Sequence, residues 1–365
     1  MECYITSTGR YLPGPAIASE DITKYLGSLS DEEQVGQQVL AMNGIRQRHY
    51  AQDDCQNATE TVYEMAAKAA EHCLRDAGAD KQISFMAAGS TYAPFSGPGI
   101  ASWIHPLIAA RAVQARHPME ISSHGGICSS AAAALVGAVR AIKSGEHQTA
   151  LAIGTEHASE VLKSSVIKPV DDRSQHAELR YSKWFMSVFL RFMLSDGAGA
   201  FLLASQPASK GISLSVNWTH SLSMAHVCPL CMKLDNSNQL LSQDVSVLNR
   251  HLFPAAEIFG RAALERHHDS LSTYRVVLPH LSSFFFRRRM ERMFEQLAGK
   301  GSPPVPYWTN LDTAGNTGSA SIYVMLHEYL ESTQLQHGDR LLLFIPESGQ
   351  FNFVLVSLTV HVSHE

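Results

Sequence analysis

The stretch that decides the fold is a short glycine-containing segment that ends in a cysteine and two serines, Ser123-His124-Gly125-Gly126-Ile127-Cys128-Ser129-Ser130. Apolar residues just before it, Met119 and Ile121, predict a short strand. The alanine-rich run 131–142 after it is a strong helix former, and Lys143-Ser144-Gly145 is a typical C-terminal stop. Cys128 is therefore expected at or near the first turn of a buried helix.

This position predicts a reactive thiol at Cys128. Free backbone N–H groups and the positive end of the helix dipole stabilise an anion at a helix start. A cysteine with a pKa of ~8.5 is only a few per cent thiolate at neutral pH, so a lowered pKa would turn Cys128 into a nucleophile. The alternative is a small apolar residue packed in a tight turn.

Size and composition narrow the class of protein. The chain has 365 residues, 45% hydrophobic and 17% charged, enough for two domains or one large two-lobed unit. Its net charge of −5 gives no reason to expect nucleic-acid or membrane-surface binding. No apolar run reaches membrane-spanning length, and the N-terminus lacks signal-peptide features. We therefore expect a cytoplasmic protein.

The six cysteines are expected to be thiols in that compartment. Cys228 and Cys231 form a lone C-x-x-C, for which a zinc site would need a second ligand pair; only His220 and His226 lie near in the sequence. We expect a loop with two thiols there, and neither a metal nor a cofactor.

The order of apolar segments predicts an α/β protein with substantially parallel sheets. Strands are expected at 4–11, 83–89, 149–154, 211–217, 275–280, 340–345 and 351–360, and helices at 59–77, 131–142, 254–267 and 314–327. Residues 191–194 and 200–204 are expected as two strands joined by a turn at 195–199. Residues 162–187 and 221–243 are expected as surface insertions or loops.

Each half of the chain offers a strand, a reactive residue and then a helix, which favours a duplicated architecture. We expect an N-terminal unit, 1–205, with Cys128, and a C-terminal unit, 206–365, with His280 at the end of a strand and Asn316 before a helix.

With these three residues in place, the sequence resembles the ketoacyl-ACP synthase III branch of the thiolase superfamily, whose members use a cysteine, a histidine and an asparagine. The resemblance spans almost the whole chain and implies a layered αβαβα fold with two pseudo-symmetric halves. The shared motifs are Gly9-Arg10-Tyr11-Leu12-Pro13, Asn43-Gly44-Ile45-Arg46-Gln47-Arg48-His49, the Cys128 segment, Ser195-Asp196-Gly197-Ala198-Gly199-Ala200, Leu278-Pro279-His280 and Gly315-Asn316-Thr317-Gly318-Ser319-Ala320-Ser321.

The resemblance implies an acyltransferase that makes carbon–carbon bonds. Cys128 would accept an acyl group, and the backbone N–H groups of Cys128 and Gly349 would hold the oxyanion. His280 and Asn316 would donate hydrogen bonds to the carbonyl oxygen of a second thioester, malonyl or β-ketoacyl. The resemblance also implies a role in fatty-acid-derived or polyketide metabolism, and the length of the acyl chain stays open.

Departures from the family pattern refine the expectation. Thiolases carry a second catalytic cysteine in the closing loop, and Glu347-Ser348-Gly349-Gln350 has none. Acetyl-CoA-using initiators stack the adenine on a tryptophan and an arginine, where this chain has Gln38 and Met42. A carrier-protein-bound donor is therefore favoured over acyl-CoA.

Three further expectations concern partners. Arg287, Arg288 and Arg289 form a candidate docking patch for an acidic acyl carrier protein, the alternative being a solvated charged face. Phe95 and Trp103 lie in the family's dimer-interface segment, which implies a homodimer whose acyl pocket they line. This segment is similar to that of ketosynthases that form dialkylresorcinols and cyclohexanediones.

Two other functions stay open from the sequence. A ketosynthase-like acyltransferase would pass the acyl group from Cys128 to a hydroxyl or amine, with His280 as general base. A non-catalytic partner subunit would only shape another ketosynthase's pocket, and has no need of all three residues.

Overall fold

Nine strands form one hydrogen-bonded sheet in the order β11-β12-β13-β8-β1-β7-β6-β4-β5. The computed structural model describes residues 1–29, 32–78, 81–171, 189–237, 239–299 and 301–363. The strands are β1 Tyr4–Tyr11, β2 Ile17–Ala18, β3 Gln47–Arg48, β4 Phe85–Ser90, β5 Glu120–Gly125, β6 Thr149–Glu156, β7 Gly197–Ala204, β8 Gly211–Ser223, β9 Met232–Asp235, β10 Leu240–Gln243, β11 Val276–Pro279, β12 Arg340–Pro346 and β13 Asn352–Ser363. The helices are α1 Ile22–Leu26, α2 Glu32–Asn43, α3 Val62–Leu74, α4 Ile100–Arg111, α5 Ser130–Ser144, α6 Ala158–Leu162, α7 Ser164–Asp171, α9 Val245–Arg266, α10 Arg287–Ala298, α11 Leu311–Ala314 and α12 Ser321–Ser332.

The sheet repeats one topology twice. Strands β4-β6-β7-β1 lie in the same order as β11-β12-β13-β8, and in each set the first pair is parallel and the next two are antiparallel. The two sets meet at a narrow junction, where Tyr4 pairs with Ser215 and Ile5 with Leu214. The predicted pseudo-symmetric halves are therefore confirmed. The division into units 1–205 and 206–365 stays a prediction.

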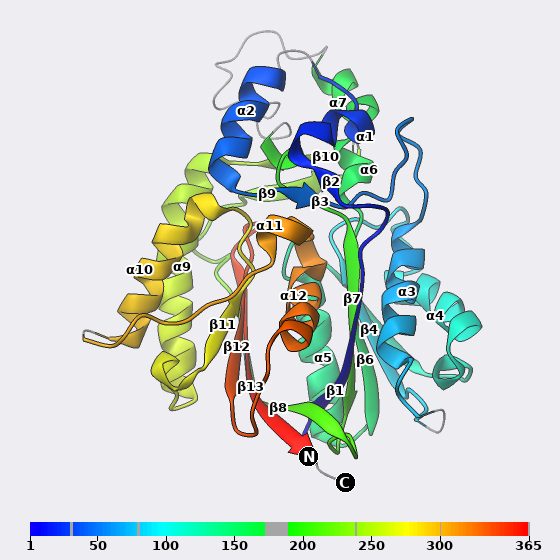
Figure 1. The fold of residues 1–365 in the computed structure, drawn as a ribbon, viewed down its shortest axis with the longest axis vertical. Helices are drawn as coiled ribbons and strands as arrows, with labels where there is room; N and C mark the ends of the chain where they lie inside the picture. Colours follow the sequence, from blue (N-terminus) through cyan, green and yellow to red (C-terminus); the bar gives the residue numbers. More distant parts are fainter. Residues whose placement is uncertain (30–31, 79–80, 172–188, 238, 300, 364–365) are drawn as a thin grey trace.

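Five layers result from this repeat (Figure 1). Helices α3 and α4 pack on one side of the first half-sheet, α9 and α10 on the far side of the second, and α5 and α12 lie between the two. The central helices are joined where Tyr323 Oη donates to the Ala131 carbonyl oxygen at 2.8 Å. The predicted αβαβα layering is confirmed.

The expectation of a substantially parallel sheet is wrong. Only β11–β12, β6–β4 and β4–β5 are parallel, and the other neighbouring pairs of this sheet are antiparallel. Strands β7 and β13 are as apolar as parallel strands because helices cover both of their faces, so their composition does not reveal their direction.

The predicted turn at 195–199 is also wrong, because β7 begins at Gly197 and residues 191–194 form no strand of the sheet. The glycines allow close packing instead. A Cβ atom on Gly199 would lie 2.4 Å from Tyr323 Cβ, so the absent side chain lets α12 approach β7.

The two segments predicted as surface loops carry secondary structure. Within 221–243, β9 and β10 form a two-stranded sheet, and every residue of β10 is buried. Within 162–187, α7 buries Ile167, and residues 172–187 lie outside the described residues.

Helix α9 begins at Val245, well before the predicted start at Pro254, because Asp244 caps it by accepting from the Val247 N–H at 3.0 Å. Among the helices described here, none is long and apolar enough to cross a membrane.

We predict that Gly199→Ala lowers the free energy of unfolding by about 1–3 kcal/mol, the usual cost of overpacking a core. Chemical denaturation measures this change. Gly125→Ala is the matched control, since an added Cβ there meets no atom within 4 Å. Equal stability of the two variants would contradict the close-packing role of Gly199.

Candidate active site

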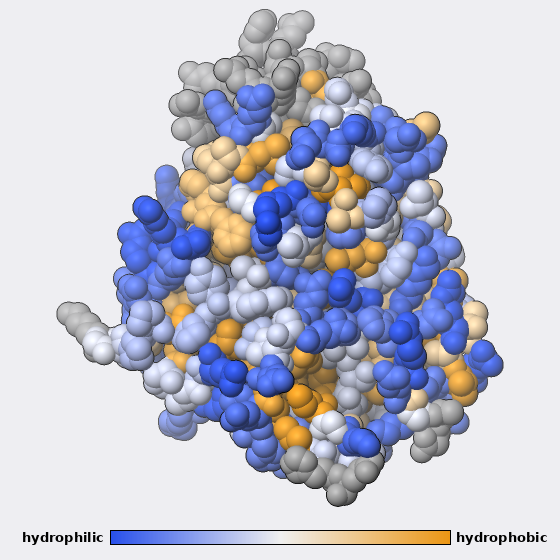
Figure 2. Space-filling view, viewed as in Figure 1, coloured by the Kyte–Doolittle hydropathy of each residue, from blue (hydrophilic) through white to orange (hydrophobic). Residues whose placement is uncertain are grey.

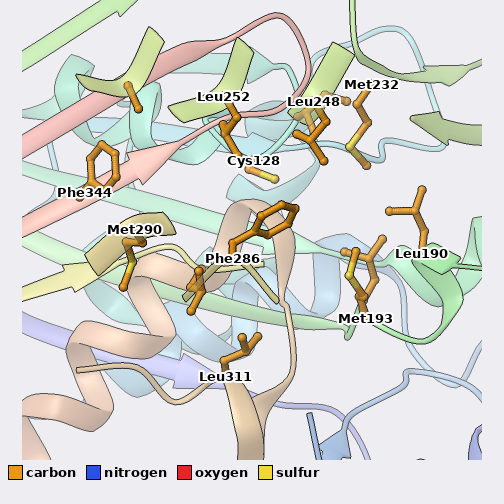
Figure 3. Packing of buried hydrophobic residues seen from close by; sticks show 14 of the residues in the cluster. Cys128, Leu190, Met193, Met232, Leu248, Leu252, Phe286, Met290, Leu311 and Phe344 are labelled. Carbon is orange, nitrogen blue, oxygen red and sulfur yellow. The ribbon is translucent and has the colours of Figure 1, made fainter. Parts of the chain in front are cut away.

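Cys128 lies in the turn between β5 and α5, two residues before the helix starts at Ser130. The turn is closed by the Ser130 N–H, which donates to the Ile127 carbonyl oxygen at 3.1 Å. Cys128 itself is only 8% exposed. Figure 3 shows it between Leu248 and Leu252 of α9 and Phe286, within an apolar cluster. The expected strand–cysteine–helix unit is therefore present.

The expected lowering of the thiol pKa is wrong for the unacylated protein. Burial raises the pKa of Cys128, and the nearby carboxylates of Glu347 and Glu156 raise it further, which outweighs the opposing effect of its own backbone N–H. The two acids come from β6 and from the loop after β12, so the local segment around Cys128 carries no sign of them.

Glu347 is the residue that the sequence analysis missed. Its carboxylate is 6% exposed and accepts from Ser129 Oγ at 2.6 Å and from the Gln350 N–H at 3.1 Å. The Gly349 N–H also faces the carboxylate, and burial raises the pKa of Glu347. An acyl oxygen would have to displace this carboxylate to reach the Gly349 N–H, so the oxyanion role of Gly349 stays a prediction. The available signal was a charged residue in the closing loop beside the expected oxyanion residue Gly349.

His280 follows β11 directly, and its backbone N–H donates to the Phe344 carbonyl oxygen at 2.8 Å. The register of the parallel pair β11–β12, with Pro279 opposite Phe344, places the imidazole beside the closing loop. The side chain is 5% exposed, and burial lowers its pKa from 6.5 to about 4. The imidazole is therefore neutral at neutral pH and offers one N–H donor.

Asn316 is fixed by backbone bonds on both sides. Its N–H donates to the Met193 carbonyl oxygen at 3.2 Å, and its own carbonyl oxygen accepts from the Ser195 N–H at 2.9 Å. Its side-chain Oδ1 accepts from the Gly318 N–H at 3.0 Å. The Nδ2 group donates to no other described residue, so its two N–H bonds remain available to a ligand.

Cys128 opens on two small cavities. The first, about 40 Å³, is shared with His280 and lined by apolar side chains of α9 and α10. The second, about 20 Å³, is shared with Glu156 and Gly318. Cys128 and His280, from opposite halves of the chain, therefore share one cavity. Asn316 lies two residues before Gly318, which lines the second cavity.

Phe95 and Trp103 lie elsewhere in this chain. Phe95 is 52% exposed and stacks on Trp103 at 4.9 Å between ring centroids, and Trp103 stacks on Tyr63. Phe95 lines a separate cavity of about 540 Å³ beside the edge strand β5. Neither residue lines either of the two cavities described at Cys128, so a pocket role for them depends on a second copy and stays a prediction.

The three arginines of α10 differ in their contacts. Arg287 pairs with Glu291 at 3.1 Å, and Arg289 donates to Asn249 of α9 and lies over Phe253. The Arg288 side chain is exposed and pairs with no described residue. Figure 2 shows hydrophilic residues on the side of the molecule where α10 lies in Figure 1. Of the predicted patch, Arg289 thus holds α10 against α9, and Arg287 and Arg288 remain at the surface.

The C-x-x-C segment is the expected loop with two thiols; it exposes Pro229 and Leu230 and supports the closing loop. Cys228 and Cys231 are buried free thiols. The N–H groups of Cys231 and Met232 both donate to the Gly349 carbonyl oxygen, at 2.8 and 3.0 Å. This pair of bonds fixes the peptide of Gly349 beside Glu347.

Known proteins share this fold. Residues 266–346 match the family model described as the 3-oxoacyl-[acyl-carrier-protein (ACP)] synthase III C terminal. A beta-ketoacyl-[acyl-carrier-protein] synthase III of Aquifex aeolicus is 26% identical over 94% of this chain and 95% of its own. A variant of OleA from Xanthomonas campestris superposes with a TM-score of 0.77 at 19% identity over 98% of both chains. AbyA1, a tetronic acid condensing enzyme, does so at 0.75 and 19% over 98% of this chain and 99% of its own.

The fold and these matches indicate similarity to acyl-transferring condensing enzymes of the ketosynthase type. More narrowly, the chain is similar to ketoacyl-ACP synthase III proteins, over residues 266–346 by the family model and over 94% of its length by the Aquifex aeolicus relative.

We predict that acid destabilises the wild type more than a His280→Asn variant. Unfolded His280 takes up a proton near pH 6.5, whereas the folded residue resists protonation until about pH 4. The unfolded state therefore binds more protons in this window, and the stability of the wild type falls as the pH drops through it. Urea denaturation from pH 7 to 4 measures both proteins, and parallel curves would contradict a buried neutral imidazole.

Proposed function

We propose that the chain is a ketosynthase that holds an acyl group on Cys128 and joins it to a malonyl- or β-ketoacyl-thioester by Claisen condensation. One observation carries this proposal: Cys128 and His280, contributed by opposite halves, line one buried cavity. Cysteine serves such a reaction because its sulfur is both a good nucleophile and a good leaving group.

The first step transfers the acyl group from a carrier thioester to Cys128. The sulfur attacks the thioester carbonyl carbon, and the carrier thiol leaves with a proton. The acyl chain would enter the apolar cavity lined by Leu252, Phe286 and Met290. Flexible methionine side chains can repack to make room for a longer chain.

The second step needs an enolate, whose oxygen requires hydrogen-bond donors. Neutral His280 offers one N–H, and Asn316 offers the free N–H groups of Nδ2. Donors fixed in advance by backbone bonds stabilise developing charge without reorganising. The enolate forms when a malonyl thioester loses carbon dioxide or a β-ketoacyl thioester loses an α-proton. Its carbon then attacks the acyl carbon, and the bond from that carbon to the Cys128 sulfur breaks to release a thiolate, which takes up a proton.

We further propose an acyl carrier protein as donor. Helix α10 lines the cavity with Met290 and Met293 on its inner face and exposes Arg287 and Arg288 on its outer face. An acidic carrier bound to these cations would deliver its thioester near the cavity. A homodimer that covers Phe95 and Trp103 belongs to the same proposal, as does condensation of two acyl intermediates in dialkylresorcinol- or cyclohexanedione-type pathways.

Two variants test acyl transfer and condensation separately. Cys128→Ala is expected to lose both the acyl adduct seen by intact mass and all condensation product. His280→Ala is expected to keep the adduct and to condense about 10²–10³-fold more slowly, the usual effect of removing one oxyanion donor. Incubation with acyl and malonyl or β-ketoacyl thioesters, followed by mass spectrometry, measures both.

Full product formation by Cys128→Ala would contradict the proposal. A wild-type product that is an ester or amide, with no new carbon–carbon bond, would instead support simple acyl transfer.

A further inference from the structure

The carboxylate of Glu347 is buried at the nucleophile without a counter-ion. It forms no ion pair with any residue in the described ranges. Three donors hold it instead: the Ser129 hydroxyl and the N–H groups of Gly349 and Gln350. A buried charge without a partner is costly, and a turn between two strands does not need one. The position therefore points to a chemical use.

The contacts place this carboxylate over the reactive turn. Ser129 is the residue after Cys128, and a Cβ atom added to Gly349 would lie 2.0 Å from Glu347 Oε1 and 2.8 Å from Ile127 Cγ1. Glu347 is therefore bonded to the residue after Cys128, and Gly349 lies between Glu347 and the residue before it. Asn352 Nδ2 donates to Ser129 Oγ at 2.9 Å and fixes the hydroxyl that holds the carboxylate.

The two groups influence each other's charge. The Glu347 carboxylate disfavours a Cys128 thiolate, so two negative charges on this pair are disfavoured. Acylation of Cys128 removes the thiol and leaves the carboxylate as the charged member. The base is then in place when the second substrate arrives.

We propose that Glu347 is the catalytic base that removes the α-proton of the second thioester, and that this substrate is a β-ketoacyl thioester that loses no carbon dioxide. The inference rests on the proposed ketosynthase function and names the substrate class for the same site.

The steps balance in atoms and charge. The α-C–H bond breaks, its proton moves to a Glu347 oxygen, and its electron pair forms an enolate whose oxygen accepts from His280 and Asn316. The enolate carbon attacks the acyl carbon, and the bond from that carbon to the Cys128 sulfur breaks. The thiolate released then takes the proton back from Glu347, which returns both groups to their starting states.

Electrostatics favours this substrate over a malonyl thioester. Among the residues that the structure describes, no lysine or arginine lines the two cavities at Cys128, and two carboxylates, Glu156 and Glu347, act on the sulfur. A malonyl carboxylate would add a third negative charge with no cation to receive it. A methylene between two carbonyl groups is uncharged and acidic enough for a carboxylate base.

The test compares the wild type with Glu347→Gln, with Glu257→Gln as the matched control. Glu257 of α9 is partly exposed and pairs with Arg261 at 2.9 Å. We expect Glu347→Gln to form the acyl adduct on Cys128 as well as the wild type, which also shows that its site is folded. Condensation with a β-ketoacyl thioester should fall about 10²–10⁴-fold, the range for loss of a general base, and Glu257→Gln should equal the wild type.

A second measurement on the wild type alone keeps the inference independent of the variant. Offered malonyl and β-ketoacyl thioesters in competition, it should consume the β-ketoacyl thioester and release no carbon dioxide. Preference for malonyl with release of carbon dioxide, or full condensation by Glu347→Gln, would overturn the role of Glu347 and leave the ketosynthase function standing. Absence of any adduct on wild-type Cys128 would instead refute the proposed function itself.

Discussion

The hydrogen bond from Ser129 Oγ to Glu347 Oε2, at 2.6 Å, joins the turn that carries the nucleophile to the loop that closes the site. The first group belongs to the N-terminal half and the second to the C-terminal half. Because both ends are buried, the bond is shielded from water and is stronger than one at the surface. The position of the closing loop, and with it the charge beside Cys128, depends on this contact.

The repeated topology makes such a contact available. Each half contributes one helix to the central layer, and the two helices, α5 and α12, meet there through Tyr323 and Ala131. Residues at the ends of equivalent elements therefore converge although they are far apart in the chain. Cys128 before α5 and Asn316 before α12 occupy related positions, and His280 follows the strand that opens the second set.

Much of the fold could be predicted from local sequence. The alanine-rich run after Cys128 forms α5, and Gly145 ends it in a left-handed conformation. The errors arose where tertiary packing decides. The sequence around Gly199 is typical of a turn, but glycine is needed there because Tyr323 leaves no room for a side chain. The polar and proline-containing stretch before α9 reads as a loop, yet it folds back to support Gly349 through Cys231 and Met232.

The functional site shows the same contrast between features that are local in the sequence and features that depend on tertiary packing. Its catalytic candidates were found from residue types at the ends of elements, because such positions are local features. The charge state of Cys128 could not be predicted in this way, because the carboxylates of Glu156 and Glu347 reach the thiol from distant segments. Glu347 itself has the sequence appearance of a solvated turn residue, and only the fold shows that it is buried.

The acyl group on Cys128, with His280 and Asn316 facing its carbonyl, is tested most directly by a crystal structure of the protein after incubation with an acyl thioester. The account predicts continuous density from Cys128 Sγ into the cavity lined by Leu252 and Phe286, with the imidazole of His280 and the carboxamide of Asn316 facing one common opening beside the acyl carbonyl. An acyl group on another residue, or an acyl carbonyl that neither His280 nor Asn316 faces, would contradict it.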